Sequence, residues 1–343
     1  MSLKTPITSH SLLLITFISQ TLLNSIWSQN SVGSYPSDII PTMSSGWNIL
    51  LGDGTISKDL RSFKKNGFFY VESDQVAKWV VFKAPNSGIT SKNSSNTRSE
   101  LGQLKRWIPE TGAKLSATLK VMHVSTSGDA RSAAAYSVVV GQIHSDEGHE
   151  NEPLKIFYKK FPGHKKGSVF WNYEINTNGD NSKRWDYSTP VWGYDMSIVG
   201  SSNNEYPPEP SDGIALGEEF SYEIKVVDGI MYLSFKRANE ESKKFVKSLI
   251  KSSFPSKERI PSQVIELYSN INRDGVERSD AYAGERQFFK LGAYNQSNGK
   301  NPTKNMVWNT GSETFKGNIQ EQYKNGSYVE VWFKKVGLKE EQN

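Results

Sequence analysis

Apolar and polar residues alternate with a period of two through most of the chain, and this pattern restricts the possible folds more than any other feature. Between residues 114 and 121, Leu115, Ala117, Leu119 and Val121 share one parity, while lysine, serine and threonine occupy the other. Similar alternation recurs at 169–175, 222–226, 231–235 and 329–333. Strands with one polar face are typical of antiparallel sheets rather than buried parallel ones. The sequence therefore predicts an all-β chain, a jelly-roll β-sandwich of two antiparallel sheets with a cleft on one concave sheet.

The sequence also predicts turns, loops and one helix between the strands. Asp228-Gly229, between two alternating runs, is a strong hairpin signal. Residues 239–252 are predicted to form a helix, because Phe245, Leu249 and Ile250 would share one of its faces. The polar stretches 85–97 and 200–213 are expected to be long loops, which in a compact domain are usually functional or disordered.

The first 28 residues are predicted to be a signal peptide. Their apolar run is short and is interrupted by polar residues, unlike a membrane span of about 20 apolar residues. The remainder, 29–343, is expected to form a single catalytic domain with its core at about 39–338. Export makes a secreted or periplasmic location the expectation, with no membrane attachment after cleavage. We also expect a monomer.

Charge and composition exclude several classes of function. The chain of 343 residues has a net charge of +5 and contains no cysteine. The lack of cysteine removes thiol nucleophiles and zinc-thiolate sites. The mild basicity fits a polyanionic partner, but it is too weak to indicate nucleic acid. We predict no cofactor and no metal site; the acidic run 146–152 has oxygen ligands suited to calcium, but a solvated acidic loop is the simpler interpretation.

Three short stretches contain the chemically interesting side chains. They are Arg98-Ser99-Glu100-Leu101-Gly102, Gln142-Ile143-His144 and Phe288-Phe289-Lys290-Leu291-Gly292-Ala293-Tyr294-Asn295-Gln296. Within each stretch the candidate groups share one strand parity, so neighbouring strands would gather them on one sheet face.

Each residue also has a simpler structural interpretation. Arg98 and Glu100 are two positions apart and can form an ion pair along one strand. His144 can be an ordinary surface or core histidine, and Tyr294 an amphipathic core residue. Lys290 can be a solvated strand residue. No one of these side chains indicates an enzyme without the others.

Together, and in this chain order, the three stretches resemble the motifs of the alginate lyases of polysaccharide lyase family 7. The resemblance covers roughly residues 39–338, and the nine-residue third motif is the most specific part. Gly102 stands where the first motif usually has a second arginine, so fewer cations are expected beside Arg98. Phe288 replaces a tyrosine, and Leu291 replaces alanine or valine.

The resemblance implies a secreted lyase that cleaves the 1,4-bonds of alginate by β-elimination, with the substrate cleft on the concave sheet. Arg98 and Gln142 would neutralise the uronate carboxylate, as hydrogen-bond donors suited to an anion. His144, with an ordinary pKa near ~6.5, would serve as base, and Tyr294 as acid. Glu100, Lys290, Asn295 and Gln296 would bind substrate. The isoleucine in the second motif favours guluronate-containing blocks.

Two other functions compete with this hypothesis. A jelly-roll glycoside hydrolase would need paired carboxylates at a suitable spacing, which the sequence lacks. A non-catalytic carbohydrate-binding module would use exposed aromatic residues such as Trp185, Trp192 and Tyr194, but it would have no need of a His/Tyr pair. A lyase acting on another polyuronate is also consistent with these residues.

Overall fold

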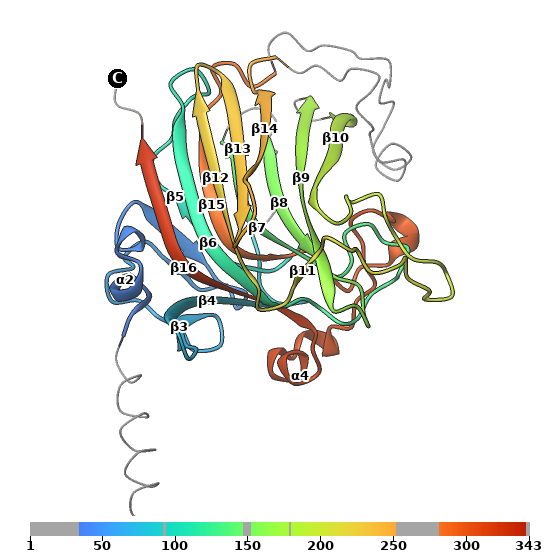
Figure 1. Cartoon of the computed structure of the whole chain (residues 1–343). Coiled ribbons are helices and arrows are strands. Elements are labelled where there is room, and N and C mark those ends of the chain that lie inside the picture. Colours follow the sequence, from blue (N-terminus) through green and yellow to red (C-terminus); the bar gives the residue numbers. More distant parts are fainter. Residues whose placement is uncertain (1–33, 92–93, 147–151, 178–179, 252–280, 341–343) are drawn as a thin grey trace, which may run out of the picture.

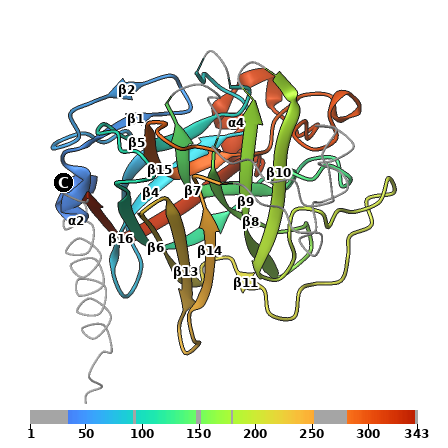
Figure 2. The same cartoon turned by 90° about the horizontal axis from the view of Figure 1, so that it is seen from above.

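The computed structural model describes residues 34–91, 94–146, 152–177, 180–251 and 281–340. Two antiparallel sheets form the molecule, in two layers (Figures 1 and 2). The prediction of a jelly-roll β-sandwich is therefore confirmed. Among the described residues no helix has the length and apolar character to cross a membrane.

The larger sheet has the strand order β10-β9-β8-β7-β15-β5-β1-β2, with β11 paired to β9. Its strands are β1 (Trp47–Leu50), β2 (Ile56–Ser57), β5 (Arg98–Gln103), β7 (Ser137–Ser145), β8 (Leu154–Lys159), β9 (Lys166–Thr177), β10 (Asp180–Trp192), β11 (Ile214–Ala215) and β15 (Gln287–Asn295).

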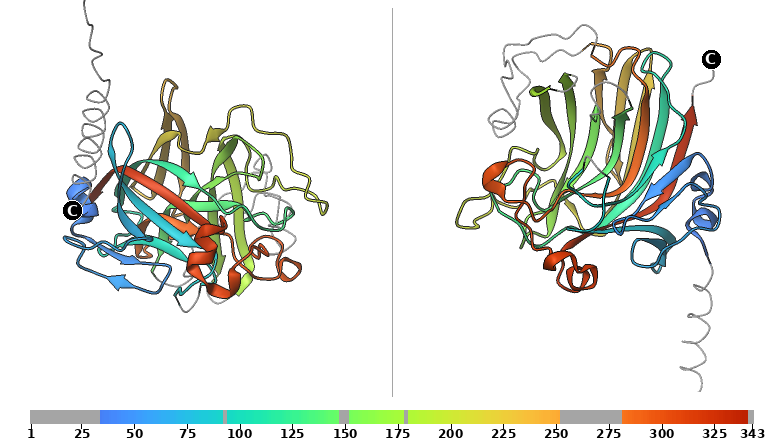
Figure 3. Two further views of the ribbon diagram at one scale, coloured as in Figure 1. Left: turned by 90° about the horizontal axis from the view of Figure 1, so that it is seen from below. Right: turned by 180° about the vertical axis from the view of Figure 1, so that it is seen from behind.

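The second sheet has the order β14-β13-β12-β6-β16-β4-β3. Its strands are β3 (Phe69–Ser73), β4 (Lys78–Pro85), β6 (Ala113–His123), β12 (Glu219–Val227), β13 (Ile230–Arg237), β14 (Lys243–Ser248) and β16 (Tyr328–Glu340). Within the described ranges the helical segments are all short: α2 (Pro36–Ile39), η1 (Pro41–Met43), η2 (Pro302–Lys304), η3 (Phe315–Gly317) and α4 (Ile319–Lys324). Figure 3 shows α4 and the neighbouring loops at one end of the sandwich.

The core lies between the two sheets, where the apolar parity of each strand points inward. Leu115, Ala117 and Leu119 of β6 are all buried, as the alternation predicts. Tyr222 of β12 reaches across the core and donates a hydrogen bond from its hydroxyl to the Val140 carbonyl at 3.0 Å. Gly141 makes room for it, because a Cβ there would lie 2.5 Å from the Tyr222 hydroxyl. The two sheets thus contact each other closely beneath β7.

The predicted hairpin at Asp228-Gly229 joins β12 to β13. Both turn residues have positive φ, 51° and 75°, as a two-residue turn between right-twisted strands requires.

The predicted helix at 239–252 is wrong. Residues 243–248 form β14, which pairs with β13 in an antiparallel register from Ile230↔Ser248 to Phe235↔Lys243. Phe245 packs against the core while its neighbours Lys244 and Val246 are exposed. The unpaired edge of β13 offers a row of backbone partners, and this tertiary pairing outweighs a local pattern that is compatible with either period.

Candidate active site

The three sequence motifs lie on three adjacent strands, β5, β15 and β7. In the register, Tyr294 lies opposite Arg98, and Lys290 lies between Gly102 and Gln142. Phe288 lies opposite His144. Segments almost 200 residues apart in sequence therefore meet on one face of the larger sheet.

Glu100 is the centre of this cluster. Its side chain is only 2% exposed. One oxygen contacts Arg98 Nη1 at 3.1 Å and Lys290 Nζ at 3.3 Å, and the other accepts a short hydrogen bond from Gln142 Nε2. All three strands are thus tied to one carboxylate. Glu100 orients the groups around it, and its own oxygens are occupied by protein partners.

Arg98 is held on several sides but keeps unused donor capacity. Its Nη2 donates to Ser94 Oγ at 2.8 Å, and its guanidinium carbon lies 3.8 Å from the centre of the Tyr294 ring. Burial by itself would lower the pKa of Arg98, but Tyr294 and Glu100 raise it above the usual value. The buried Nε has no partner among the described residues. One N–H of this buried guanidinium is therefore left without a hydrogen bond in the described part of the chain.

His144 is oriented by the backbone. Its Nδ1 lies 2.6 Å from the Ser145 carbonyl, which can only accept, so Nδ1 carries the proton and Nε2 is left as the basic nitrogen. Nε2 lies 3.9 Å from a carboxylate oxygen of Glu152. Burial, followed by the charge of Lys290, lowers the pKa of His144 to about 4, although Glu152 opposes the shift. The imidazole is neutral at neutral pH.

A polar row crosses the larger sheet from β1 to β10 through this cluster. The residues in register are Asn48, Gly102, Lys290, Gln142, Lys155, Asn172 and Ser188. Lys155 is buried and forms ion pairs with Glu174 at 2.9 Å and Glu152 at 3.2 Å. Sequence reasoning missed this buried lysine, although its position in the apolar strand 154–158 was a signal.

The two ends of the row differ. At the β10 end, Asn172 donates to the sulfur of the buried Met196 at 3.2 Å, and the Met196 backbone N–H donates to Ser188. The ammonium of Lys155 lies 5.0 Å from the centre of the Trp308 ring. Loop residues therefore cover this end.

At the β1 end there is an open pocket of about 210 Å³. It is lined by Asn48, Leu50, Ser91, Arg98, Glu100, Gly102, Arg106, Phe288 and Lys290.

Arg106 lies in this pocket and was not among the predicted site residues. Its guanidinium carbon lies 3.9 Å from the centre of the Phe288 ring, and its Nε donates to Asp146 at 2.9 Å. Gly102 and Arg106 both line the pocket, and a Cβ at Gly102 would lie only 2.7 Å from Asn48 Oδ1. Because Arg106 is paired with Asp146, the expectation that fewer cations surround Arg98 stays a prediction.

Asn295 has the opposite strand parity to Tyr294 and Lys290 and lies in the interior. Asn295 is fully buried and its Nδ2 donates to the Pro85 carbonyl and Asn86 Oδ1, both at 3.0 Å. Gln296 is also buried, with Nε2 3.4 Å from the Tyr294 carbonyl. These contacts fix the end of β15 and the loop beside it.

Two further expectations concern residues elsewhere. Trp192, expected to be exposed, is buried against Phe220 and Phe235. The Trp185 side chain and residues 147–151 of the acidic run lie outside what the structure describes. Within the described residues, no group of three or more potential metal ligands occurs.

Comparisons with known proteins agree with the fold and with the motifs. A family model described as Alginate lyase matches residues 42–340. The crystal structure of the exolytic PL7 alginate lyase AlyA5 from Zobellia galactanivorans has 67% sequence identity and a TM-score of 0.84, covering 90% of this chain and 99% of that one. An alginate lyase of Klebsiella pneumoniae is 29% identical over 294 residues, 74% of this chain and 82% of that protein. Alginate lyase A1-II′ of family 7 shares the fold at 16% identity and a TM-score of 0.53, covering 90% of this chain and 100% of that one.

The jelly-roll sheet and these comparisons define a polysaccharide-degrading enzyme, a lyase. The chain belongs to the alginate lyases of polysaccharide lyase family 7.

The buried position of Glu100 gives a stability prediction. Glu100→Gln removes the negative charge between Arg98 and Lys290, so we expect the free energy of unfolding to fall by about 3–5 kcal/mol, as for other broken buried ion pairs. The matched control is Glu219→Gln, because Glu219 and Lys334 form an exposed pair at 2.6 Å worth about 0–1 kcal/mol. Chemical denaturation measures both variants. Equal small losses would mean that the Glu100 carboxylate does not hold the cluster together.

Proposed function

We propose that this enzyme cleaves the 1,4-glycosidic bonds of alginate by β-elimination and leaves 4,5-unsaturated uronate ends. The observation that carries this proposal is the convergence of Arg98 and Gln142 with His144 and Tyr294 on one sheet face. Elimination removes the carbon-5 proton, which only the adjacent carboxylate acidifies. That carboxylate resists a second negative charge, so donors must offset it while a base and an acid move the protons.

Arg98 and Gln142 are suited to the uronate carboxylate. The Arg98 Nε–H has no protein partner among the described residues. Gln142 uses one N–H on Glu100, and because Nε2 carries two hydrogens, the second can be donated to substrate. Two cations, Arg98 and Lys290, are held beside Glu100 and near Glu152, so positive groups are already in place where an anion would bind.

His144 and Tyr294 divide the proton transfers. With Nδ1 protonated toward Ser145, Nε2 of His144 accepts the carbon-5 proton, and Glu152 then lies near the positive imidazolium. Tyr294 protonates the departing 4-oxygen; its hydroxyl lies 3.5 Å from Ser94 Oγ. In guluronate the proton and the leaving oxygen are on opposite sides, which suits two separate groups. In mannuronate they are on the same side, so Tyr294 can serve as both base and acid.

Exolytic action is the mode that we propose. The 67% identical AlyA5 is an exolytic enzyme. In this chain, the polar row is open beside Gly102 and covered by Met196 and Trp308 at its other end. A polyuronate lying across the strands would end against that cover, so the bond next to the chain end would lie beside His144.

Location and assembly also remain proposals. Export, to the outside of the cell or the periplasm, rests on the sequence of residues 1–28, which lie outside the described residues. A monomer that acts on alginate, without nucleic acid or membrane partners, is the simplest form of the enzyme. A lyase for another polyuronate is the alternative, and a non-catalytic binding module would not generate unsaturated products.

The main test measures the ultraviolet absorbance of the new unsaturated uronate on defined blocks. Tyr294→Phe keeps the ring but removes the acid, so turnover should fall by ~10²-fold or more on all blocks. His144→Ala should reduce guluronate cleavage more than mannuronate cleavage, because only guluronate requires a separate base. Pectate, another polyuronate, is the control substrate. Near-normal Tyr294→Phe rates on alginate, or faster wild-type cleavage of pectate, would contradict the proposal.

The lowered pKa of His144 predicts the acidic side of the pH profile. The base acts when neutral, and a pKa of about 4 keeps it neutral well below the usual range. Protonation of His144 should therefore not lower the wild-type kcat/KM on guluronate blocks between pH 7 and about pH 5. Lys290→Gln removes a charge that lowers this pKa, so its acidic limb should move to higher pH. A wild-type profile that halves near pH 6.5 would refute the assignment.

Product sizes test the exolytic proposal. Digestion of a uniform guluronate chain should release the same small product from the first minutes, while the average length of the remaining polymer falls slowly. Chromatography of a time course, with viscosity measured in parallel, distinguishes the modes. A rapid loss of viscosity together with a ladder of intermediate sizes would mean that the enzyme cuts internally.

A further inference from the structure

The outer face of the second sheet, on the far side of the core from the candidate active site, carries three successive cross-strand rows of polar residues. The first row is Lys236, Ser221, Thr118 and Lys335; the second is Lys244, Ser234, Glu223, Ser116 and Gly337; the third is Val246, Tyr232, Lys225, Lys114 and Lys339. We call these three rows the lysine face. Its only acidic position is Glu223, so it is strongly positive.

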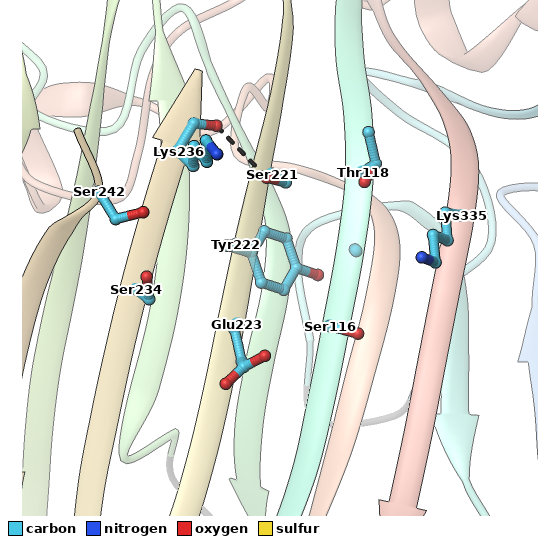
Figure 4. A pocket seen from close by; sticks show the side chains of 10 residues that line it. Ser116, Thr118, Ser221, Tyr222, Glu223, Ser234, Lys236, Ser242 and Lys335 are labelled. Carbon is cyan, nitrogen blue, oxygen red and sulfur yellow. Dashed lines mark hydrogen bonds between the residues drawn. The ribbon is translucent and has the colours of Figure 1, made fainter. Parts of the chain in front are cut away.

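A shallow groove of about 290 Å³ runs over the first two rows. Figure 4 shows Lys236 on β13 and Lys335 on β16 at its two sides, with the hydroxyl groups of Ser221 and Thr118 between them. Three strand spacings separate the two lysines, about 14 Å between their backbones. Positive charges therefore flank a hydroxyl-lined floor.

Most of these lysines form no ion pair with any residue that the structure describes. Within the described residues, the ammonium groups of Lys236 and Lys335 have neither a hydrogen bond nor an ion pair, and both side chains are exposed. Glu223 is paired with Lys114 at 2.7 Å. Just beyond the face, Lys334 is neutralised by Glu219 at 2.6 Å. The ammonium groups of Lys236 and Lys335 thus line the groove without a counter-charge among the described residues.

In the third row, lysines lie opposite one another, and a bound anion would reduce their electrostatic repulsion. Lys225 and Lys339 both lie directly across from Lys114 on neighbouring strands. Like charges in directly opposed positions destabilise a sheet. Beside them Tyr232 is 44% exposed, and an exposed ring of this kind can pack against the apolar side of a sugar.

We propose that the lysine face is a second, non-catalytic binding surface for an anionic polyuronate chain. The ammonium groups would bind its carboxylates, and the serine and threonine hydroxyls would bind its sugar hydroxyls. Alginate, the polymer that the enzyme family degrades, is the occupant to which we commit; the inference rests on alginate being the substrate. The surface would keep the enzyme on the polymer between cleavage events, and its binding would weaken with salt.

The test separates binding from cleavage. Binding is measured by affinity electrophoresis in gels containing polymeric alginate at low salt, in a Tyr294→Phe background so that the polymer survives. Adding Lys236→Ala and Lys335→Ala should raise the dissociation constant about five- to tenfold, given the modest contribution of each exposed charge pair. The matched control is Lys64→Ala with Lys324→Ala, which removes the same charge from exposed positions elsewhere. Equal weakening by both pairs, or none by the first, overturns the proposal.

Kinetics with an otherwise wild-type enzyme give the second measurement. The Lys236→Ala/Lys335→Ala variant should cleave short oligouronates at the wild-type rate but should have a higher KM on polymer. Lost turnover on short substrates would contradict a non-catalytic surface. Gels containing DNA are the control for selectivity. If DNA retards wild type and variant equally, the lysine face is selective for polyuronate. If the variant loses as much affinity for DNA as for alginate, the face binds polyanions in general. If the wild type produces no unsaturated uronate at all, the proposed function fails, independently of these binding results.

Discussion

The buried carboxylate of Glu100 is the contact on which the arrangement of the site depends. It sits on the middle of β5 and binds Arg98 from its own strand, Lys290 from β15 and Gln142 from β7. A charge removed from water is tolerated only when it is fully paired and hydrogen-bonded. Glu100 therefore fixes both cations and the amide in position before any substrate arrives. This arrangement is preorganised, because one carboxylate already holds both cations and the amide.

Because the donors are fixed in advance, the surrounding loops decide how a polymer can approach them. The same polar row runs from an open pocket at Gly102 to a covered end at Asn172, where Met196 and Trp308 lie over the sheet. The groups that we propose to be catalytic lie between the two ends. If the row were uncovered, the same side chains could also act on bonds in the middle of a polymer. The exolytic mode that we propose therefore depends on the loops and not on the motifs.

The sequence predicted the sandwich because strand periodicity is a local property that survives in the folded state. The hairpin at Asp228-Gly229 could likewise be predicted from the sequence, since positive φ at both turn residues restricts which amino acids fit. The helix predicted at 239–252 failed because residues 243–248 pair with the edge of the preceding strand, β13 (Ile230–Arg237), and the apolar spacing of 239–252 does not reveal that pairing. The pairing of Arg98 with Glu100 was also predicted, but as a simple pair; its burial and its links to two other strands were not.

What the sequence determined by itself is the inventory of chemical groups and their strand parity: an arginine, a glutamine, a histidine and a tyrosine on faces that can coincide. Only the tertiary structure decided how these groups behave. It placed Ser145 so that Nε2 of His144 is the basic nitrogen, and it buried that ring so that its pKa falls to about 4. It also brought Arg106 beside Gly102. The physical reason is that desolvation, tautomer choice and charge proximity depend on neighbours distant in the chain, whereas periodicity and residue chemistry do not.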